Sequence, residues 1–149
     1  MDGSNQKVGW AEWVALPALG LPALVAKVDT GARTSALHAF NIEALGPAAT
    51  PHVRFDIHPI PGRSDVTVTC SAPLVGRREV TSSNGESDER FVIVTEIEID
   101  PARWPIEITL TDRANMSYRM LLGRQALSEG ISVQPTESFL QPQLGYDSY

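Results

Sequence analysis

The sequence has 149 residues, of which 42% are hydrophobic and 20% are charged, and its formal net charge is −6. This length fits one domain, and the composition excludes a disordered or collagen-like chain. The negative charge argues against nucleic acid as the main partner, because phosphate binding needs a basic face. The longest apolar stretch, residues 14–28, is interrupted by Pro17, Gly20, Pro22 and Lys27, so we expect no membrane span.

The N-terminal residues are polar and lack the apolar core of an export signal. Cys70 is the only cysteine, which excludes an internal disulfide bond and fits a reducing compartment. We therefore expect a cytoplasmic protein. We divide it into a flexible N-terminus (1–8), one folded domain (9–140) and a flexible tail (141–149).

Most of the chain has the pattern of β-strands. Apolar residues precede Asp29, and later segments alternate apolar and polar residues, with many β-branched side chains. Alternation with a period of two predicts half-buried strands. The clearest segments are residues 66–70, 91–99 and 106–111.

Residues 74–81 and 90–96 are the expected arms of a hairpin with a polar tip around Asn84-Gly85. Such a tip is either an ordinary exposed turn or a mobile flap over a cleft. Residues 34–38 are a candidate turn of helix, and residues 123–130 predict one short helix that stops at Gly130. The predicted architecture is all-β, a compact barrel or sandwich with one short helix.

The sequence Asp29-Thr30-Gly31-Ala32 follows the apolar strand at the point where that strand ends. The three letters D-T-G alone occur by chance in about three chains per hundred of this length. The context adds weight, because threonine supplies a hydroxyl and glycine allows close backbone approach around a carboxylate. The plainer alternative is that Asp29 only caps a turn. Later in the chain, Met120–Gly123 forms a second apolar strand that runs into a glycine.

In this order of motifs the chain resembles the retropepsin-like aspartic proteases, and in particular their bacterial branch labelled ATP-dependent zinc proteases. That branch is associated with glutamate ligases of the ATP-grasp class that modify a ribosomal protein. The resemblance covers about residues 9–140. It rests on the segments KVDTGARTSALHA (27–39), RFVIVTEIEI (90–99), WPIEITLTDR (104–113) and YRMLLGRQAL (118–127).

The resemblance implies a closed all-β barrel with a flap hairpin, an aspartic endopeptidase activity, and a catalytic role for Asp29, Thr30 and Gly31. The mechanism needs two carboxylates that share one proton, one acting as base on water and the other as acid. The chain has a single D-T-G. We therefore expect a homodimer, in which Thr30 braces the paired loops and Gly31 lets them approach.

Ten of the twelve basic residues are arginine, whose fork of donors matches carboxylates. Arg33 stands where retroviral members usually carry an acidic or amide residue. We predict that Arg33, beside Ala32, and the hairpin residues Arg77, Arg78 and Arg90 bind an acidic peptide. The resemblance implies glutamate-rich tails made by the ligase.

Two alternatives stay open for this reading. The hairpin arginines could pair with the acidic residues Glu79, Glu86, Asp88 and Glu89 of the same hairpin. The chain could also be a catalytically silent dimeric module that binds acidic peptides, with Arg33 holding both aspartates ionised.

We predict no metal and no cofactor. The candidate zinc ligands His38, His52, His58 and Cys70 lack the close spacing of a zinc site, and no H-E-x-x-H or C-x-x-C occurs. The sequence has no phosphate-binding P-loop pattern, so any ATP dependence would belong to the partner ligase. A metallopeptidase would instead be sensitive to chelators.

Overall fold

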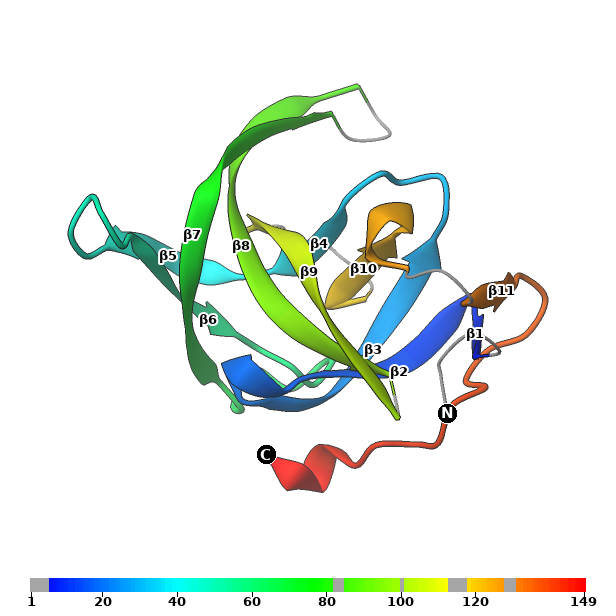
Figure 1. Cartoon of the computed structure of the whole chain (residues 1–149). Coiled ribbons are helices and arrows are strands. Elements are labelled where there is room, and N and C mark those ends of the chain that lie inside the picture. Colours follow the sequence, from blue (N-terminus) through cyan, green and yellow to red (C-terminus); the bar gives the residue numbers. More distant parts are fainter. Residues whose placement is uncertain (1–5, 82–84, 100, 113–117, 128–130) are drawn as a thin grey trace.

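The computed structural model describes residues 6–81, 85–99, 101–112, 118–127 and 131–149 (Figure 1). Its described part is built almost entirely from strands, with three short 3₁₀ turns: η1 (Pro17–Leu19), η2 (Arg124–Ala126) and η3 (Tyr146–Ser148). The strands are β1 (Lys7–Gly9), β2 (Ala11–Leu16), β3 (Leu21–Asp29), β4 (Ser35–His38), β5 (Phe40–Leu45), β6 (His52–Ile57), β7 (Val68–Thr81), β8 (Ser87–Ile99), β9 (Ala102–Thr111), β10 (Met120–Gly123) and β11 (Ser132–Gln134).

Nine strands form one mixed sheet in the order β2-β3-β10-β4-β9-β8-β7-β6-β5. The strand β2 also pairs with β8 through Ala15 and Glu98, which nearly closes the first six strands into a ring. The strands β7, β6 and β5 extend the sheet beyond that ring (Figure 1). The predicted all-β barrel is thus confirmed. No helix in the described ranges is both long and apolar enough to cross a membrane.

The core follows the alternation of the sequence. In β8, Ile93, Ile97 and Ile99 are fully buried, whereas Glu96 between them is exposed. The largest side chain of the core, Phe55, comes from β6. Each such apolar side chain contributes about 1.5–3 kcal/mol when it leaves water. Over residues 95–99 of β8 the period-two pattern therefore matches the face that points inward.

The predicted hairpin is present and longer than its expected arms. The strands β7 and β8 pair antiparallel from Leu74 opposite Ile93 to Thr81 opposite Ser87. In Figure 1 these two green strands curve over the ends of β4 and β10. Residues 82–84 of the predicted tip lie outside the described residues.

The prediction of a helical turn at residues 34–38 is wrong. Residues 35–38 form β4, which runs parallel to β9 and antiparallel to β10. Its residue Leu37 lies between Leu110 on one side and Met120 on the other, and it is fully buried. Pairing on both edges with strands distant in sequence overrides the weak local preference for helix.

The helix predicted over residues 123–130 is reduced to the 3₁₀ turn η2 in its described part. Leu127 already has an extended backbone (φ −82°, ψ 116°), and residues 128–130 lie outside the described residues. The carbonyl oxygen of Ala126 accepts a hydrogen bond from Trp104 Nε1 at 2.7 Å. This tertiary bond, with the bonds of Arg124 and Gln125 described below, stands in place of a continued helical ladder.

Residues near both ends of the described chain make contacts with the rest of the fold. Lys7 and Val8 belong to β1, which pairs in parallel with β11. The C-terminal segment is packed on the barrel: the hydroxyl of Tyr149 contacts both backbone groups of Ala23, and the ring of Tyr146 lies 5.2 Å from that of Trp13. These contacts join residues far apart in the sequence, which is why no local pattern predicted them.

A buried carboxylate fastens this segment. Glu12 is fully buried, and its two oxygens accept four backbone hydrogen bonds. The donors are Gly9 (3.1 Å), Trp13 (3.1 Å), Leu140 (2.9 Å) and Gln141 (3.0 Å). A buried charge is tolerated only with such partners. Glu12 therefore joins the start of β2 to the segment that follows β11.

We expect Glu12→Gln to destabilise the protein by roughly 3 kcal/mol, because an amide NH₂ would face two backbone donors and leave them unpaired. Urea unfolding of the two chains measures this loss. The control is Glu137→Gln, which changes an exposed carboxylate beside the same segment and should cost less than about 0.5 kcal/mol. Equal losses in both variants would contradict the role of Glu12.

The thiol of Cys70 should be inert in the folded protein. Burial, with a smaller effect from Asp56, raises the pKa of Cys70 to about 12. At pH 8 only about one thiol in ten thousand would then be ionised, and the thiolate is the reactive form. A chromogenic thiol reagent at pH 8 should react slowly with the native chain and rapidly in urea, with Cys70→Ser as the blank. Equal rates in both conditions would contradict the burial.

Candidate functional site

Asp29 is the last residue of β3, and the parallel neighbour β10 ends at the same level, where Gly123 lies opposite Asp29. The chain then turns sharply. Oδ1 of Asp29 accepts a hydrogen bond from the backbone N–H of Gly31 at 3.0 Å, and its carbonyl oxygen accepts one from Ala32 at 3.1 Å. These two bonds hold the carboxylate at the mouth of the turn.

Gly123 allows the loop after Asp29 to cross β10 closely. A Cβ atom at Gly123 would lie 2.5 Å from both the carbonyl carbon and the oxygen of Thr34. Real Cβ atoms essentially never approach backbone so closely. The glycine that ends the second apolar strand is therefore required by packing and not by backbone conformation.

The turn η2 supports the loop after Asp29 through three hydrogen bonds. The backbone N–H groups of Arg124 and Gln125 donate to the carbonyl oxygens of Ala32 (2.8 Å) and Arg33 (3.2 Å). The guanidinium of Arg124 also donates to the carbonyl oxygen of Gly31 at 3.3 Å. The loop after Asp29 therefore depends on Gly123, which ends β10, and on Arg124, which follows it.

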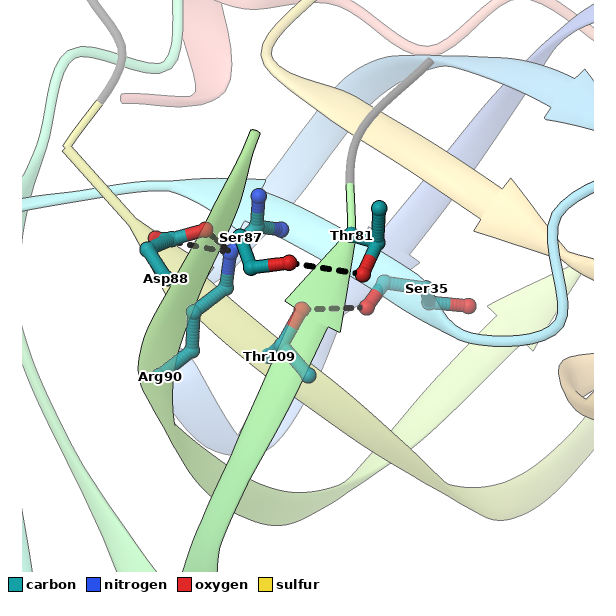
Figure 2. A network of polar contacts seen from close by, with 6 residues as sticks. All are labelled: Ser35, Thr81, Ser87, Asp88, Arg90 and Thr109. Carbon is teal, nitrogen blue, oxygen red and sulfur yellow. Dashed lines mark hydrogen bonds and ion pairs between the residues drawn. The ribbon is translucent and has the colours of Figure 1, made fainter. Parts of the chain in front are cut away.

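Two buried hydroxyl groups continue this support below the loop. The hydroxyl of Ser35 accepts the N–H of Gly123 at 3.1 Å, and Thr109 donates its hydroxyl to the carbonyl oxygen of Ser35 at 3.0 Å (Figure 2). Both residues are 1% exposed. The ends of β4, β9 and β10 are thus joined directly under the loop.

A cavity of about 970 Å³ lies between this loop and the hairpin β7–β8. Six of the eight predicted site residues line it: Asp29, Gly31, Ala32, Arg33, Arg78 and Arg90. Thr30 is exposed at the tip of the loop and is not part of this lining. The structure therefore brings the D-T-G loop and part of the arginine set to one cavity.

Arg77 lies apart from this cavity. Its guanidinium stacks over the ring of Phe91 at 4.9 Å and is 3.4 Å from Glu89. Because neighbouring residues of a strand point to opposite faces, Arg77 and Arg78 lie on different faces of the hairpin. The predicted set of hairpin arginines is therefore split by the pleat of β7.

The arginines of the cavity differ in their partners. Arg78 pairs with Glu107 of β9 at 2.9 Å, and Arg90 pairs with Asp88 at 3.1 Å (Figure 2). No carboxylate within the described ranges forms an ion pair with the exposed Arg33. The alternative of pairing within the hairpin thus holds for Arg77 and Arg90, whereas Arg78 pairs outside it.

Sequence reasoning missed several residues of this site. Glu107, Thr111 and Gln125 line the cavity, and Arg124 and Ser35 support the loop. Arg124 directly follows the apolar-apolar-glycine motif, so its position was a usable signal. The residues of β9 carried no such signal, because only strand order places that strand beside β4 and β8.

The histidines do not form a metal centre in the described part of the chain, which contains no group of three or more possible ligands. The ring nitrogen Nδ1 of His58 lies 3.2 Å from both the carbonyl oxygen of Val66 and the hydroxyl of Thr67. His38 is buried, and this burial lowers its pKa.

A second cavity, of about 450 Å³, lies between β2, η1 and the C-terminal segment. Its lining is mainly apolar and includes Trp13, Leu21 and Leu144. Glu98 also lines it and is held by Arg103 at 3.0 Å. Asp29 and the loop that follows it are not part of the lining of this cavity.

Comparison with known proteins gives related domains in longer chains. A protein of Shewanella pealeana named probable alpha-L-glutamate ligase is 46% identical over 139 residues, which are 93% of this chain and 30% of that protein. A protein of the same name from Parasynechococcus marenigrum is 42% identical over 131 residues, 88% of this chain and 28% of the relative. The chain thus spans less than a third of these relatives.

A crystal structure of a Legionella pneumophila protein of unknown function has a similar fold. It superimposes with a TM-score of 0.77 and 28% identity, covering 91% of this chain and 98% of the other. The sequence model of the family described as retropepsin-like aspartic endopeptidase RimB matches residues 7–144. Because this match spans nearly the whole chain, the protein belongs to the RimB-like family of retropepsin-like aspartic endopeptidases.

Proposed function

We propose that this protein is a homodimeric aspartic endopeptidase that trims acidic peptide tails, with Asp29 of each copy at a shared active site. The observation that carries the proposal is the position of Asp29, held by Gly31 at the mouth of the large cavity that Arg33, Arg78 and Arg90 also line. One chain contributes one such aspartate, so a second copy has to complete the pair.

In the proposed reaction the two carboxylates share one proton, since like charges about 3 Å apart do not both ionise. The ionised carboxylate takes a proton from water as the water oxygen bonds to the peptide carbonyl carbon. The protonated carboxyl group gives its proton to the carbonyl oxygen or, as the C–N bond breaks, to the leaving amine. In this proposal Thr30, which is exposed at the tip of the loop, braces the loop of the other copy. A Cβ at Gly31 would be 3.3 Å from Oδ1 of Asp29, so a larger residue would crowd the carboxylate.

The acidic substrate class is supported by charge and by the relatives. Arg33 is exposed, lines the same cavity as Asp29 and has no carboxylate partner among the described residues. Arginine binds carboxylates through two parallel hydrogen bonds. In the Shewanella relative the matching region belongs to a protein named as a glutamate ligase. We therefore propose glutamate tails as substrate, an ATP-grasp ligase as pathway partner and a cytoplasmic setting.

The competing proposal is a silent dimeric module that binds acidic peptides. Arg33 lines the same cavity as Asp29, and its guanidinium can hold a peptide carboxylate whether or not the peptide is then cut. The two proposals share the fold and the peptide, and they differ in turnover alone.

Replacement of the aspartate separates the two proposals. We expect Asp29→Asn to abolish cleavage of an oligoglutamate-tailed peptide, by about 10³-fold or more, because an amide cannot take the proton from water. The amide oxygen can still accept the Gly31 N–H, so the loop and peptide binding should be retained. Mass spectrometry of the tail, at acidic and neutral pH, measures cleavage. An uncut tail with the wild-type chain would favour the silent module, and loss of cleavage in a chelator would favour a metallopeptidase.

Mixing the two chains tests the homodimer. Refolding wild type with an equal amount of Asp29→Asn should give Asp29 in both copies in about one quarter of all dimers, because random pairing places at least one asparagine in the others. The cleavage rate per wild-type chain should therefore fall to about half. A rate that stays proportional to the wild-type chain would contradict a shared active site.

Substitution of Arg33 tests substrate selection. We expect Arg33→Ala to lower kcat/KM about tenfold for a glutamate-tailed peptide and less than about twofold for its glutamine counterpart, since one charge-assisted contact is lost. Lys27→Ala is the matched control, because it removes an exposed cation from the same strand-loop segment outside the cavity lining. Equal losses on both peptides would remove Arg33 from selection.

A further inference from the structure

Arg78 and Arg90 face each other across the hairpin. They are directly opposite in the pairing of β7 with β8, and residues opposite in an antiparallel pair share one face. Both line the cavity that contains Asp29. Like charges in this position repel each other unless anions lie between or beside them.

The anions that now neutralise this pair are held with unequal strength. Arg90 is a buried side chain, 6% exposed, and its Nε donates to both oxygens of Asp88 at 3.1 Å (Figure 2). Arg78 and Glu107 are 39% and 45% exposed and form one contact of 2.9 Å. The Arg78–Glu107 bond also spans two strands, because β8 lies between β7 and β9. The Arg78–Glu107 ion pair is therefore easier to break than the ion pair between Arg90 and Asp88.

We propose that Arg78 and Arg90 form a carboxylate subsite in which an acidic side chain of the peptide displaces Glu107 from Arg78. This inference rests on the proposed function, since it assumes an acidic peptide in the cavity. Arg90 keeps its bonds to Asp88 at Nε, and a guanidinium has further donors on its terminal nitrogens for a second anion. Glu107 is then an internal competitor that sets the affinity of the subsite.

The proposed exchange predicts that two substitutions change the affinity for an acidic peptide in opposite directions. Removing the charge of Glu107 frees Arg78 and should tighten binding of an acidic peptide, whereas removing Arg78 should weaken it. Ion pairs that are partly exposed are modest in strength, so the expected effects are several-fold changes. A purely structural Arg78–Glu107 bond would make both substitutions neutral or harmful.

Binding is measured on the Asp29→Asn chain, so that turnover does not affect the result. The ligands are a fluorescent peptide with an oligoglutamate tail and the same peptide with glutamine in place of glutamate. With added Glu107→Gln we expect the Kd of the glutamate peptide to fall about three- to tenfold, and with Arg78→Gln to rise by a similar factor. The Kd of the glutamine peptide should stay within about twofold in both.

A matched ion pair on the other face of the same hairpin provides the control. Arg77 and Glu89 lie 3.4 Å apart and do not line the cavity. Glu89→Gln changes the net charge of the chain as Glu107→Gln does, and it should leave both Kd values unchanged. Urea unfolding and the variant Arg78→Lys, which keeps the charge, separate loss of the subsite from loss of folding.

Two results would overturn the inference: an unchanged or weaker affinity for the glutamate peptide in Glu107→Gln, or equal effects of Arg78→Gln on both peptides. Failure of the glutamate peptide to bind at all would also overturn it. Cleavage by the wild-type chain is a separate readout. Tighter binding by Glu107→Gln without cleavage by the wild-type chain would support the subsite and contradict the peptidase. Cleavage by the wild-type chain without tighter binding by Glu107→Gln would support the peptidase and contradict the subsite.

Discussion

The close parallel packing of β3 against β10 is the constraint on which the site depends. It places Asp29 and Gly123 at the same level, and only a residue without a Cβ fits where β10 meets the backbone of Thr34. From that crossing, η2 reaches the loop with Arg124, and the buried hydroxyl of Ser35 accepts the N–H of Gly123. A short loop is therefore held by strands on a rigid ring, which keeps a carboxylate in one position at low entropic cost.

Charge in the cavity is balanced and not simply basic. Arg33, Arg78 and Arg90 line it together with the acidic residues Asp29 and Glu107, and Arg90 is paired with Asp88. The acidic residues limit the affinity of the cavity for any single anion, while the guanidiniums keep several pairs of N–H donors available. At these positions the frequent use of arginine has a structural explanation, because the arginines line the cavity. Other arginines form ion pairs on the surface elsewhere: Arg77, Arg54 and Arg63.

The ends of the described chain add stability at a distance from the cavity. The carboxylate of Glu12 ties Leu140 and Gln141 to β2, and Tyr149 packs against β3 at Ala23. Since β2 and β3 form one wall of the ring and β3 ends at Asp29, this fastening supports the same strand that carries the acid. The strand β3 therefore contributes both to the stability of the fold and to the geometry of the site.

The sequence by itself determined the strands, the hairpin and the family, because alternation and short motifs such as Asp29-Thr30-Gly31 are local properties of the chain. The structure confirmed the barrel and placed six predicted residues at one cavity. Local reading failed for β4, where pairing with β9 and β10 replaces a helical turn, and it did not predict the contacts of Tyr146 and Tyr149. The separation of Arg77 from Arg78 follows from the pleat of β7, whereas the partner of Arg78, Glu107, was set by strand order. Only the tertiary structure decides such contacts, because they join residues that no sequence period connects.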